Sequence, residues 1–292
     1  MSILRKPIQL KRYGCRLMGG TAQPVIPSVN LFVKVTNSCN ANCLFCSNAG
    51  SRNLSSSFNI DKLFAVIREL QDKNIFVNRL NITGGEPSVV SKRVETILEK
   101  CDEKEFQHIH VHLNTNGLLS QSQELMRHPR WNSISMSLHH YDLQSLSALY
   151  GTKISDEAFS LTGIDKQKLN ISCNLIKGYI DSPAEVKNML DFALGLDIPR
   201  IGFVSLMPIN DYCKTHYVDF DAIKIDSIPH VYFIKSMSRD ADCKCSNYLY
   251  NKDLKILEIY MRNNMNPAYC ESSLVYDGEY LRQGFQQDNI II

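Results

Sequence analysis

The chain has 292 residues, enough for one large α/β domain or for a domain of about 200 residues with a smaller appendage. Its 32 lysine and arginine residues are nearly balanced by 30 aspartate and glutamate residues, so no bulk charge draws it to nucleic acid or an anionic membrane. The basic start is not followed by an apolar stretch, and no segment approaches the roughly 18 apolar residues of a membrane-spanning helix. We therefore expect a cytoplasmic protein that binds neither nucleic acid nor a membrane.

Residues 30–208 alternate short β-like runs with helical runs, as successive βα units around a parallel sheet do. The predicted strands are 31–36, 79–83, 108–114, 132–138, 169–175 and 200–206. Asn59 is a candidate N-cap before an apolar helical stripe, and Ser182 to Glu185 form a candidate capping box with Pro183 at the first helical position. Six such units favour an α/β fold with a partial (β/α)6 TIM-like barrel, although spacing alone leaves a flat doubly wound sheet open.

The predicted strands each have one polar face. In 132–138, Ser133, Ser135 and Ser137 alternate with apolar residues, and the strands 108–114 and 169–175 divide in the same way. Because βα connections bury the apolar face under helices, the polar face would line a hydrated or ligand-filled cavity. The alternative is a solvent-exposed face of an antiparallel sheet.

The pattern changes after residue 208. Residues 211–242 are irregular, 251–264 suit a strand or a helix, and 274–281 carry the Asp277-Gly278 signal of a hairpin turn. We expect an N-terminal extension at 1–29, a barrel at 30–208 and a small C-terminal domain at 209–292.

Three of the ten cysteines are spaced as C-x3-C-x2-C directly after the first predicted strand: Cys39, Cys43 and Cys46. Without a secretory signal, cysteines are expected to be reduced and to serve as metal ligands or packing residues. Iron–sulfur clusters usually take four cysteines, so a set of three leaves one iron open for a substrate or cofactor. A zinc site with a remote fourth ligand is the alternative.

The residues around this motif resemble the radical S-adenosylmethionine (SAM) superfamily. Its GGEP motif is matched by Gly84-Gly85-Glu86-Pro87 at the end of the second predicted strand. Further matches are Asn114-Thr115-Asn116-Gly117, Ser135-Met-Ser137-Leu, Leu175-Ile-Lys177-Gly178 and Val204-Ser-Leu-Met207-Pro208. They resemble the branch that contains the GTP 3′,8-cyclase of molybdenum-cofactor biosynthesis, over about residues 30 to 210.

The resemblance implies a [4Fe–4S] cluster on Cys39, Cys43 and Cys46, with SAM chelating the open iron. It implies that Gly84, Gly85 and Glu86 contact the methionyl amine, Ser137 and Asn174 the ribose, and Met207 and the backbone near Phe45 the adenine. An electron from a donor such as flavodoxin or ferredoxin would then cleave SAM to methionine and a 5′-deoxyadenosyl radical, which takes a hydrogen atom from substrate. Such an enzyme would be oxygen-sensitive.

The sequence departs from the cyclase at its nucleotide-binding positions. The family's basic residues on the first, second and fifth strands are matched by Phe32, Asn81 and Asn170, which carry no charge. Because Arg and Lys are the usual ligands of a triphosphate, their loss disfavours GTP, although Lys34 and Lys177 compensate in part.

Four cysteines outside the barrel, Cys213, Cys243, Cys245 and Cys270, resemble those of the small auxiliary-cluster (SPASM or twitch-like) domains of many family members. We expect them to hold a second [4Fe–4S] cluster that relays electrons or shapes the substrate site. Zinc would use the same four thiolates. Unligated cysteines, or a cluster with one iron left free for substrate, also fit the sequence.

The substrate class stays open between a peptide and a polar small molecule such as a sugar, nucleoside or amino acid. His139 and His140 follow the fourth predicted strand at the mouth of the predicted cavity, where either is a candidate to contact substrate or donate a proton. Two other functions compete with a general radical SAM enzyme: GTP 3′,8-cyclisation, and a non-catalytic iron–sulfur or zinc protein.

Overall fold

The computed structural model describes residues 3–8, 10, 27–48, 57–236, 245–263, 273–284 and 290–292, and its strands form one sheet. The order in that sheet is β11-β10-β1-β2-β3-β4-β5-β6-β9-β8-β7. The strands are β1 (Ser28–Lys34), β2 (Phe76–Thr83), β3 (His110–Thr115), β4 (Ser133–Ser137), β5 (Leu169–Leu175), β6 (Arg200–Ser205), β7 (Val231–Ser236), β8 (Ser246–Lys252), β9 (Lys255–Arg262), β10 (Ser273–Tyr276) and β11 (Leu281–Gln283). Strands β1 to β6 pair in parallel in chain order, which confirms the six predicted strands and the partial barrel.

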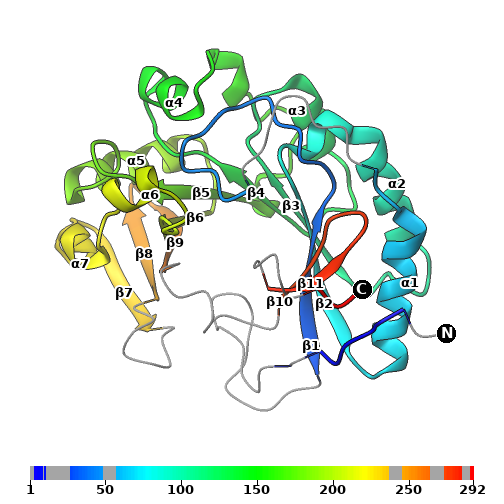
Figure 1. Ribbon diagram of the computed structural model, residues 1–292. Coiled ribbons are helices and arrows are strands. Elements are labelled where there is room, and N and C mark those ends of the chain that lie inside the picture. Colours follow the sequence, from blue (N-terminus) through cyan, green and yellow to red (C-terminus); the bar gives the residue numbers. More distant parts are fainter. Residues whose placement is uncertain are drawn as a thin grey trace.

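Helices cover the outer face of the curved sheet (Figure 1). Those on this face are α1 (Ile60–Asp72), α2 (Ser91–Cys101), α3 (Ser120–Met126), α4 (Leu143–Tyr150) and α5 (Pro183–Gly195). After β6 come α6 (Asp211–Thr215) and α7 (Phe220–Ile223), and the 3₁₀ turns are η2 (Pro87–Val90), η3 (Asp156–Phe159), η4 (Lys166–Lys168) and η5 (Ile225–Ser227). Asn59 caps α1 by accepting from the amide of Lys62, and Ser182 caps α5 by accepting from the amide of Glu185. Both predicted caps are therefore confirmed. None of the described helices is long and apolar enough to cross a membrane.

The main hydrophobic core lies between these helices and the sheet. Helix α1 contributes five buried side chains, each stabilising by about 1.5–3 kcal/mol: Leu63, Phe64, Val66, Ile67 and Leu70. Cys101 and Cys173 are fully buried in the same core. The outer-face residues of the predicted strands are thus packing residues, as their alternation indicates.

The inner face of the sheet is polar, and its side chains bind one another. The Ser133 hydroxyl lies 2.7 Å from Nε2 of His110, 2.7 Å from Nδ1 of His112 and 3.1 Å from Nη2 of Arg79. On the next row, Asn170 donates to the hydroxyl of Ser135. Parallel pairing sets these residues side by side, because register places like-facing residues opposite one another.

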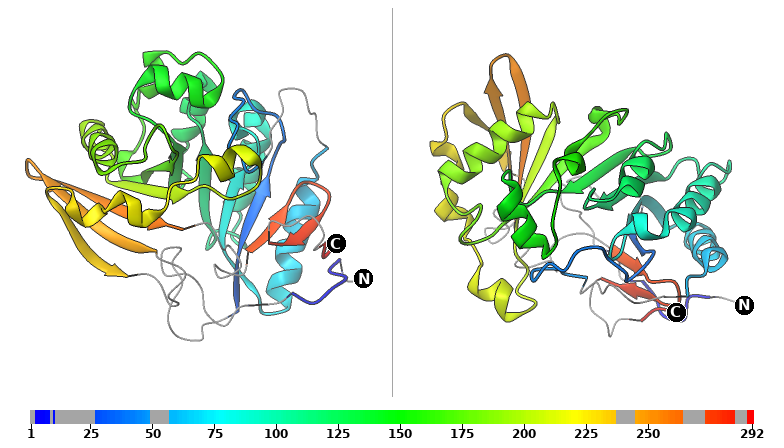
Figure 2. Two further views of the ribbon diagram at one scale, coloured as in Figure 1. Left: turned by 60° about the vertical axis from the view of Figure 1, so that its left-hand side comes forward. Right: turned by 90° about the horizontal axis from the view of Figure 1, so that it is seen from above.

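The strands after residue 208 extend the barrel sheet at both edges. Strand β9 pairs in parallel with β6, and the hairpin of β8 and β7 continues from it. Strand β10 pairs in parallel with β1, and β11 completes the predicted hairpin around Asp277-Gly278. Among the described residues, the expected C-terminal unit therefore has no sheet of its own (Figure 2). Its strands continue the barrel sheet, because β10 pairs with β1 and β9 pairs with β6.

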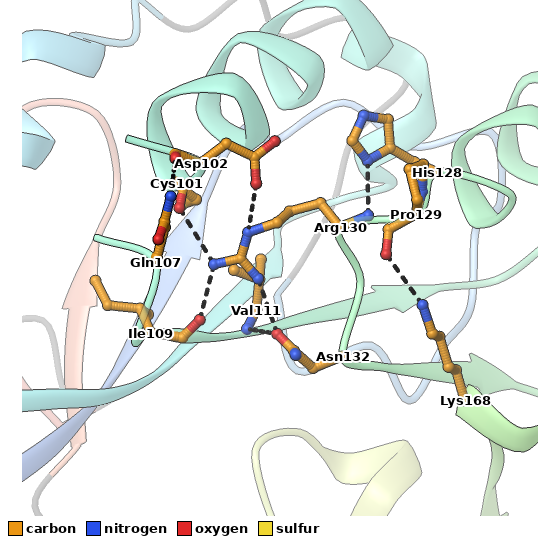
Figure 3. Close-up of polar contacts among 10 residues, drawn as sticks. All are labelled: Cys101, Asp102, Gln107, Ile109, Val111, His128, Pro129, Arg130, Asn132 and Lys168. Atoms are coloured by element: carbon orange, nitrogen blue, oxygen red, sulfur yellow. Dashed lines mark hydrogen bonds and ion pairs between the residues drawn. The ribbon is translucent and has the colours of Figure 1, made fainter. Parts of the chain in front are cut away.

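Arg130 joins three elements at the amino-terminal end of the barrel (Figure 3). Its Nε lies 3.0 Å from the Asp102 carboxylate, and Nη1 donates to Oδ1 of Asn132 at 3.0 Å. Its Nη2 donates to the carbonyls of Cys101, at the end of α2, and Ile109, before β3. A cation at a helix C-terminus also stabilises the helix dipole.

Replacing Arg130 by methionine is expected to lower the free energy of unfolding by about 2–4 kcal/mol, because two carbonyls and the Asn132 amide lose a charged donor. Urea unfolding followed by the fluorescence of the single tryptophan, Trp131, measures this. Lys168→Met is the control, because Lys168 makes one exposed bond to the Pro129 carbonyl and its loss should cost about 0.5 kcal/mol or less. Equal losses in the two variants would contradict the prediction.

Candidate active site

The three-cysteine motif lies in the loop that follows β1 and arches over the carboxyl ends of the barrel strands (Figure 1). We call residues 35–48 the cluster loop. All three thiols are half-buried, and the amide of Cys46 donates to the carbonyl of Cys43 at 3.2 Å in a tight turn. After burial, the charge of Cys46 contributes to raising the pKa of Cys39, and the charges of Cys46 and Cys39 contribute to raising that of Cys43, so the three thiols lie near one another.

These thiols suit a polynuclear iron site. Burial, and then the neighbouring thiols Cys46 and Cys39, raise the pKa of Cys43 to about 12, and burial raises the pKa of Cys39. Three thiolates so close together need cationic partners, which iron supplies. Within the described part of the chain, no three His, Cys, Asp or Glu side chains converge on a single ion. A cubane does not require such convergence, because each cysteine ligates a different iron.

The two glycines of the GGEP motif hold the cluster loop. A Cβ on Gly84 would lie 2.3 Å from the carbonyl oxygen of Thr36, and one on Gly85 would lie 2.0 Å from that of Ser38. The amides of Gly85 and Glu86 donate to those same two carbonyls at 2.7 and 2.8 Å. Glycine at these two positions therefore permits a close approach by the backbone of the cluster loop.

Glu86 is the centre of a buried hydrogen-bond network. One carboxylate oxygen accepts from the Thr115 hydroxyl at 2.7 Å and from the hydroxyl and amide of Ser88 at 2.8 and 3.1 Å. The other accepts from the amide of Asn116 at 2.8 Å. Burial raises the pKa of Glu86, and these bonds oppose that shift. The second oxygen, with one partner, retains acceptor capacity toward a ligand amine.

The remaining predicted SAM-site residues gather at the same end of the barrel. Ser137 ends β4, Asn174 lies near the end of β5, and Met207 follows β6. Phe45, in the cluster loop, is buried in a second hydrophobic cluster with Leu149, Ile176, Leu206 and Cys213. The fold thus brings together at one edge residues that are far apart in the sequence.

His139 links three of these segments and is buried, not at an open mouth as the sequence suggested. Its Nδ1 accepts from the amide of Asn174 at 3.1 Å, and its ring meets Phe45 edge-on with centroids 4.8 Å apart. Tyr150 lies on another side, 5.6 Å away, and donates to the carbonyl of Ser137. Burial lowers the pKa of His139 to about 3, so at neutral pH it is uncharged and no imidazolium is present to donate a proton.

We expect the His139 ring not to titrate between about pH 8 and pH 5 and to carry its proton on Nε2. Because the folded pKa lies below the unfolded value of about 6.5, its stabilising contribution is present at neutral pH and is lost as pH falls toward 3, by about 2 kcal/mol at pH 5. NMR of the ring nitrogens tests both points, with His139→Asn assigning the signals. A ring that titrates near neutral pH would contradict them.

The structure describes two of the four cysteines that were expected to hold a second cluster. Cys213 lies in α6, where it packs beside Phe45. Burial raises the pKa of Cys213, and the charge of Cys46 contributes to the same shift. Cys245 precedes β8 and is fully buried, with its sulfur 3.3 Å from the amide of Asn263. Cys243 and Cys270 lie outside the described residues. The second cluster therefore stays a prediction.

Sequence reasoning missed several asparagines that fix the cluster loop. Asn48 donates to the Gly84 carbonyl at 2.7 Å, and Asn116 donates to the side chain of Asn40 at 2.8 Å. Asn210 donates to the Leu44 carbonyl at 2.9 Å and caps α6. The signal in the sequence that could have found them is the large number of asparagines in these loops, because an asparagine side chain readily forms hydrogen bonds with nearby backbone groups.

Comparison with known proteins supports the same family. A sequence profile described as the radical SAM superfamily matches residues 33–193. The chain is 22% identical over 273 residues to a protein named "Probable GTP 3',8-cyclase" of Saccharolobus islandicus strain Y.N.15.51, covering 91% of this chain and 85% of that relative. It is 23% identical over 193 residues to the GTP 3′,8-cyclase of Clostridium acetobutylicum, covering 64% of this chain and 58% of that one.

Two solved structures share the fold. Streptococcus suis SuiB bound to the precursor peptide SuiA has a TM-score of 0.52 and 20% identity, over 65% of this chain and 42% of SuiB. A radical SAM methyltransferase from Sphaerobacter thermophilus has a TM-score of 0.51 and 17% identity, over 67% of this chain and 60% of that one. The chain thus spans less than two thirds of either protein. With the profile covering more than half of its length, the chain belongs to the radical SAM superfamily, whose enzymes use a [4Fe–4S] cluster and SAM.

Proposed function

We propose that this enzyme cleaves SAM reductively on a cluster held by Cys39, Cys43 and Cys46 and removes a hydrogen atom from a polar substrate. The observation that carries the proposal is the direct backbone pairing between the cluster loop and Gly85-Glu86. It connects the metal-ligating cysteines to the segment proposed to meet the methionyl amine. When bound, the cluster and SAM supply an electron-driven carbon–sulfur cleavage to methionine and a 5′-deoxyadenosyl radical.

The protein's own residues orient SAM in this proposal. Glu86 accepts a hydrogen bond from the methionyl amine beside Gly84 and Gly85. Ser137 and Asn174 bind the ribose, and Met207 with the backbone near Phe45 encloses the adenine, as the family resemblance implies. Support comes from their common position at the carboxyl ends of parallel strands, where such sheets bind ligands.

We further propose a second [4Fe–4S] cluster on Cys213, Cys243, Cys245 and Cys270, in the segment 209–292, with flavodoxin or ferredoxin as electron donor. Reduced cysteines and an oxygen-sensitive cluster suit the cytoplasm, which is the proposed location. Iron and sulfide analysis tests the second cluster. Two clusters give twice the iron of one, whereas a zinc site or unligated cysteines leave the iron of one cluster.

The substrate is proposed to be a peptide or a polar small molecule. GTP cyclisation is the second candidate, favoured by relatives that bear that name. Against it, Phe32, Asn81 and Asn170 occupy the inner face where the cyclase resemblance calls for cations, and Asn81 is 2% exposed. Incubation with GTP decides this: a cyclised product would establish the second candidate, and its absence would leave the first.

The reaction itself is tested by anaerobic incubation of the iron-loaded protein with SAM and dithionite. Equal amounts of 5′-deoxyadenosine and methionine are expected, and candidate substrates are ranked by how far they accelerate their release. If a protein with a full complement of iron makes neither product, the proposal fails and a non-catalytic metal-binding role takes its place.

A further inference from the structure

Lys34 lies at the carboxyl end of β1 on the inner face of the sheet, next to the cluster loop. It shares that face with Phe32, since alternate residues of a strand point the same way, while Leu31 and Val33 enter the core. Among the described residues, its ammonium has no hydrogen bond and no ion pair. Burial lowers the pKa of Lys34, and the charged groups that act on it are Asp277, Arg282 and Cys46.

Two further donors on the same face have no acceptor among the described residues. The register Asn81, Phe32, Val275, Arg282 runs across β2, β1, β10 and β11 as one row. In that row, Nδ2 of Asn81 and Nε of Arg282 are buried and have no hydrogen-bond partner within the described part of the chain. Lys34 lies one row nearer the cluster loop. We call Lys34, Asn81 and Arg282 the donor patch.

Within the described part of the chain, the donor patch has more cations than carboxylates. Asp277 is the carboxylate that acts on Lys34, and it already has partners within its own hairpin. It accepts from a guanidinium nitrogen of Arg282 and from the amides of Glu279 and Tyr280 at 3.2 and 2.8 Å. Among the described residues, two cations therefore face one carboxylate, and Cys46, the other anionic group that acts on Lys34, is a proposed iron ligand. A half-buried cation that has no ion pair of its own favours an anionic ligand.

We propose that the donor patch binds an anionic oxygen group of the substrate, a carboxylate or a phosphate, beside the cluster loop. All three orphan groups are donors, so the ligand must supply acceptors, and Lys34 and Arg282 supply the charge-assisted bonds. This proposal rests on the proposed function, because it assumes that the bound molecule is the substrate of the radical SAM reaction. It narrows the substrate class to molecules with an anionic group within reach of the hydrogen atom that is removed.

The test is calorimetric titration of the iron-loaded, SAM-saturated protein with inorganic phosphate in one arm and acetate in the other. We expect saturable one-to-one binding of at least one anion, and the arm that binds identifies the group. Lys34→Met should weaken that binding by about tenfold or more, as loss of one charged hydrogen bond does, and Lys34→Arg should restore it. The exposed Lys104→Met variant is the control and should bind like the wild type.

Three results would overturn the proposal: no saturable binding of either anion, undiminished binding by Lys34→Met, or binding that occurs only without SAM. The last would assign the patch to SAM's own carboxylate. Iron content and thermal melting of each variant separate misfolding from lost binding. If the wild type cleaves SAM but binds no anion, this inference alone fails. If it binds the anion but never cleaves SAM, the proposed function alone fails.

Discussion

Cys46→Ala is expected to lose the iron of the SAM-binding cluster and to form 5′-deoxyadenosine at least about a hundredfold more slowly than the wild type, because no cluster then remains in contact with SAM to reduce it. Cys46 is the last of the three thiols in the cluster loop, and its amide closes the turn on Cys43. Iron analysis, the visible absorbance of the cluster and product formation under anaerobic conditions measure the effect.

Cys101→Ala is the matched control for this change. Cys101 is fully buried in the core at the end of α2, away from the cluster loop. Its loss should cost about 1 kcal/mol of stability and leave iron and activity in place. If Cys46→Ala keeps the full iron content of the wild type, or if Cys101→Ala loses iron, the assignment of the cluster ligands is wrong.

Gly85→Ala should lower the free energy of unfolding by about 3 kcal/mol or more and reduce iron loading, since its Cβ would enter the backbone at Ser38. The nearest atoms are the carbonyl oxygen of Ser38 at 2.0 Å, its carbonyl carbon at 2.5 Å and the Asn37 oxygen at 2.8 Å. None is the end of a flexible side chain. The segment entering the cluster loop must therefore move away from Gly85-Glu86.

Gly195→Ala provides the comparison. Gly195 is the last residue of α5, and a Cβ there would meet no atom within 4 Å. This variant should be as stable as the wild type or more stable by about 1 kcal/mol or less, because alanine favours the helix. Urea unfolding of both variants measures the change in stability, and iron analysis measures the change in iron loading. A Gly85→Ala protein with normal stability and full iron would show that the close approach does not hold the loop.

The features that sequence predicted well depend on neighbouring residues. The caps at Asn59 and Ser182 each satisfy an amide three residues on, and the alternation of Ser133, Ser135 and Ser137 is a property of one strand. The spacing of the cysteines likewise lies within eight residues. Such patterns can be predicted from the sequence, because the geometry of a helix, strand or short loop alone decides which nearby residues lie close together.

The features that sequence missed depend on distant segments. His139 is buried because Phe45, Tyr150 and Asn174 converge on it from three elements. The carboxylate of Glu86 accepts hydrogen bonds from Thr115, the last residue of β3, and from Asn116, which follows it. No local pattern marks either arrangement, since each exists only once the barrel has closed.

The pairing of β10 with β1 has a consequence for how the chain is built. Strand β1, which leads into the cluster loop, has β2 on one side and the late strand β10 on the other. During synthesis, β1 emerges from the ribosome well before β10 and lacks this second neighbour until all the strands and helices between them have followed. Contacts of such large sequence separation form slowly. The cluster loop therefore reaches its final support only after β10 has been synthesised, and cluster insertion before that point would meet an incomplete barrel.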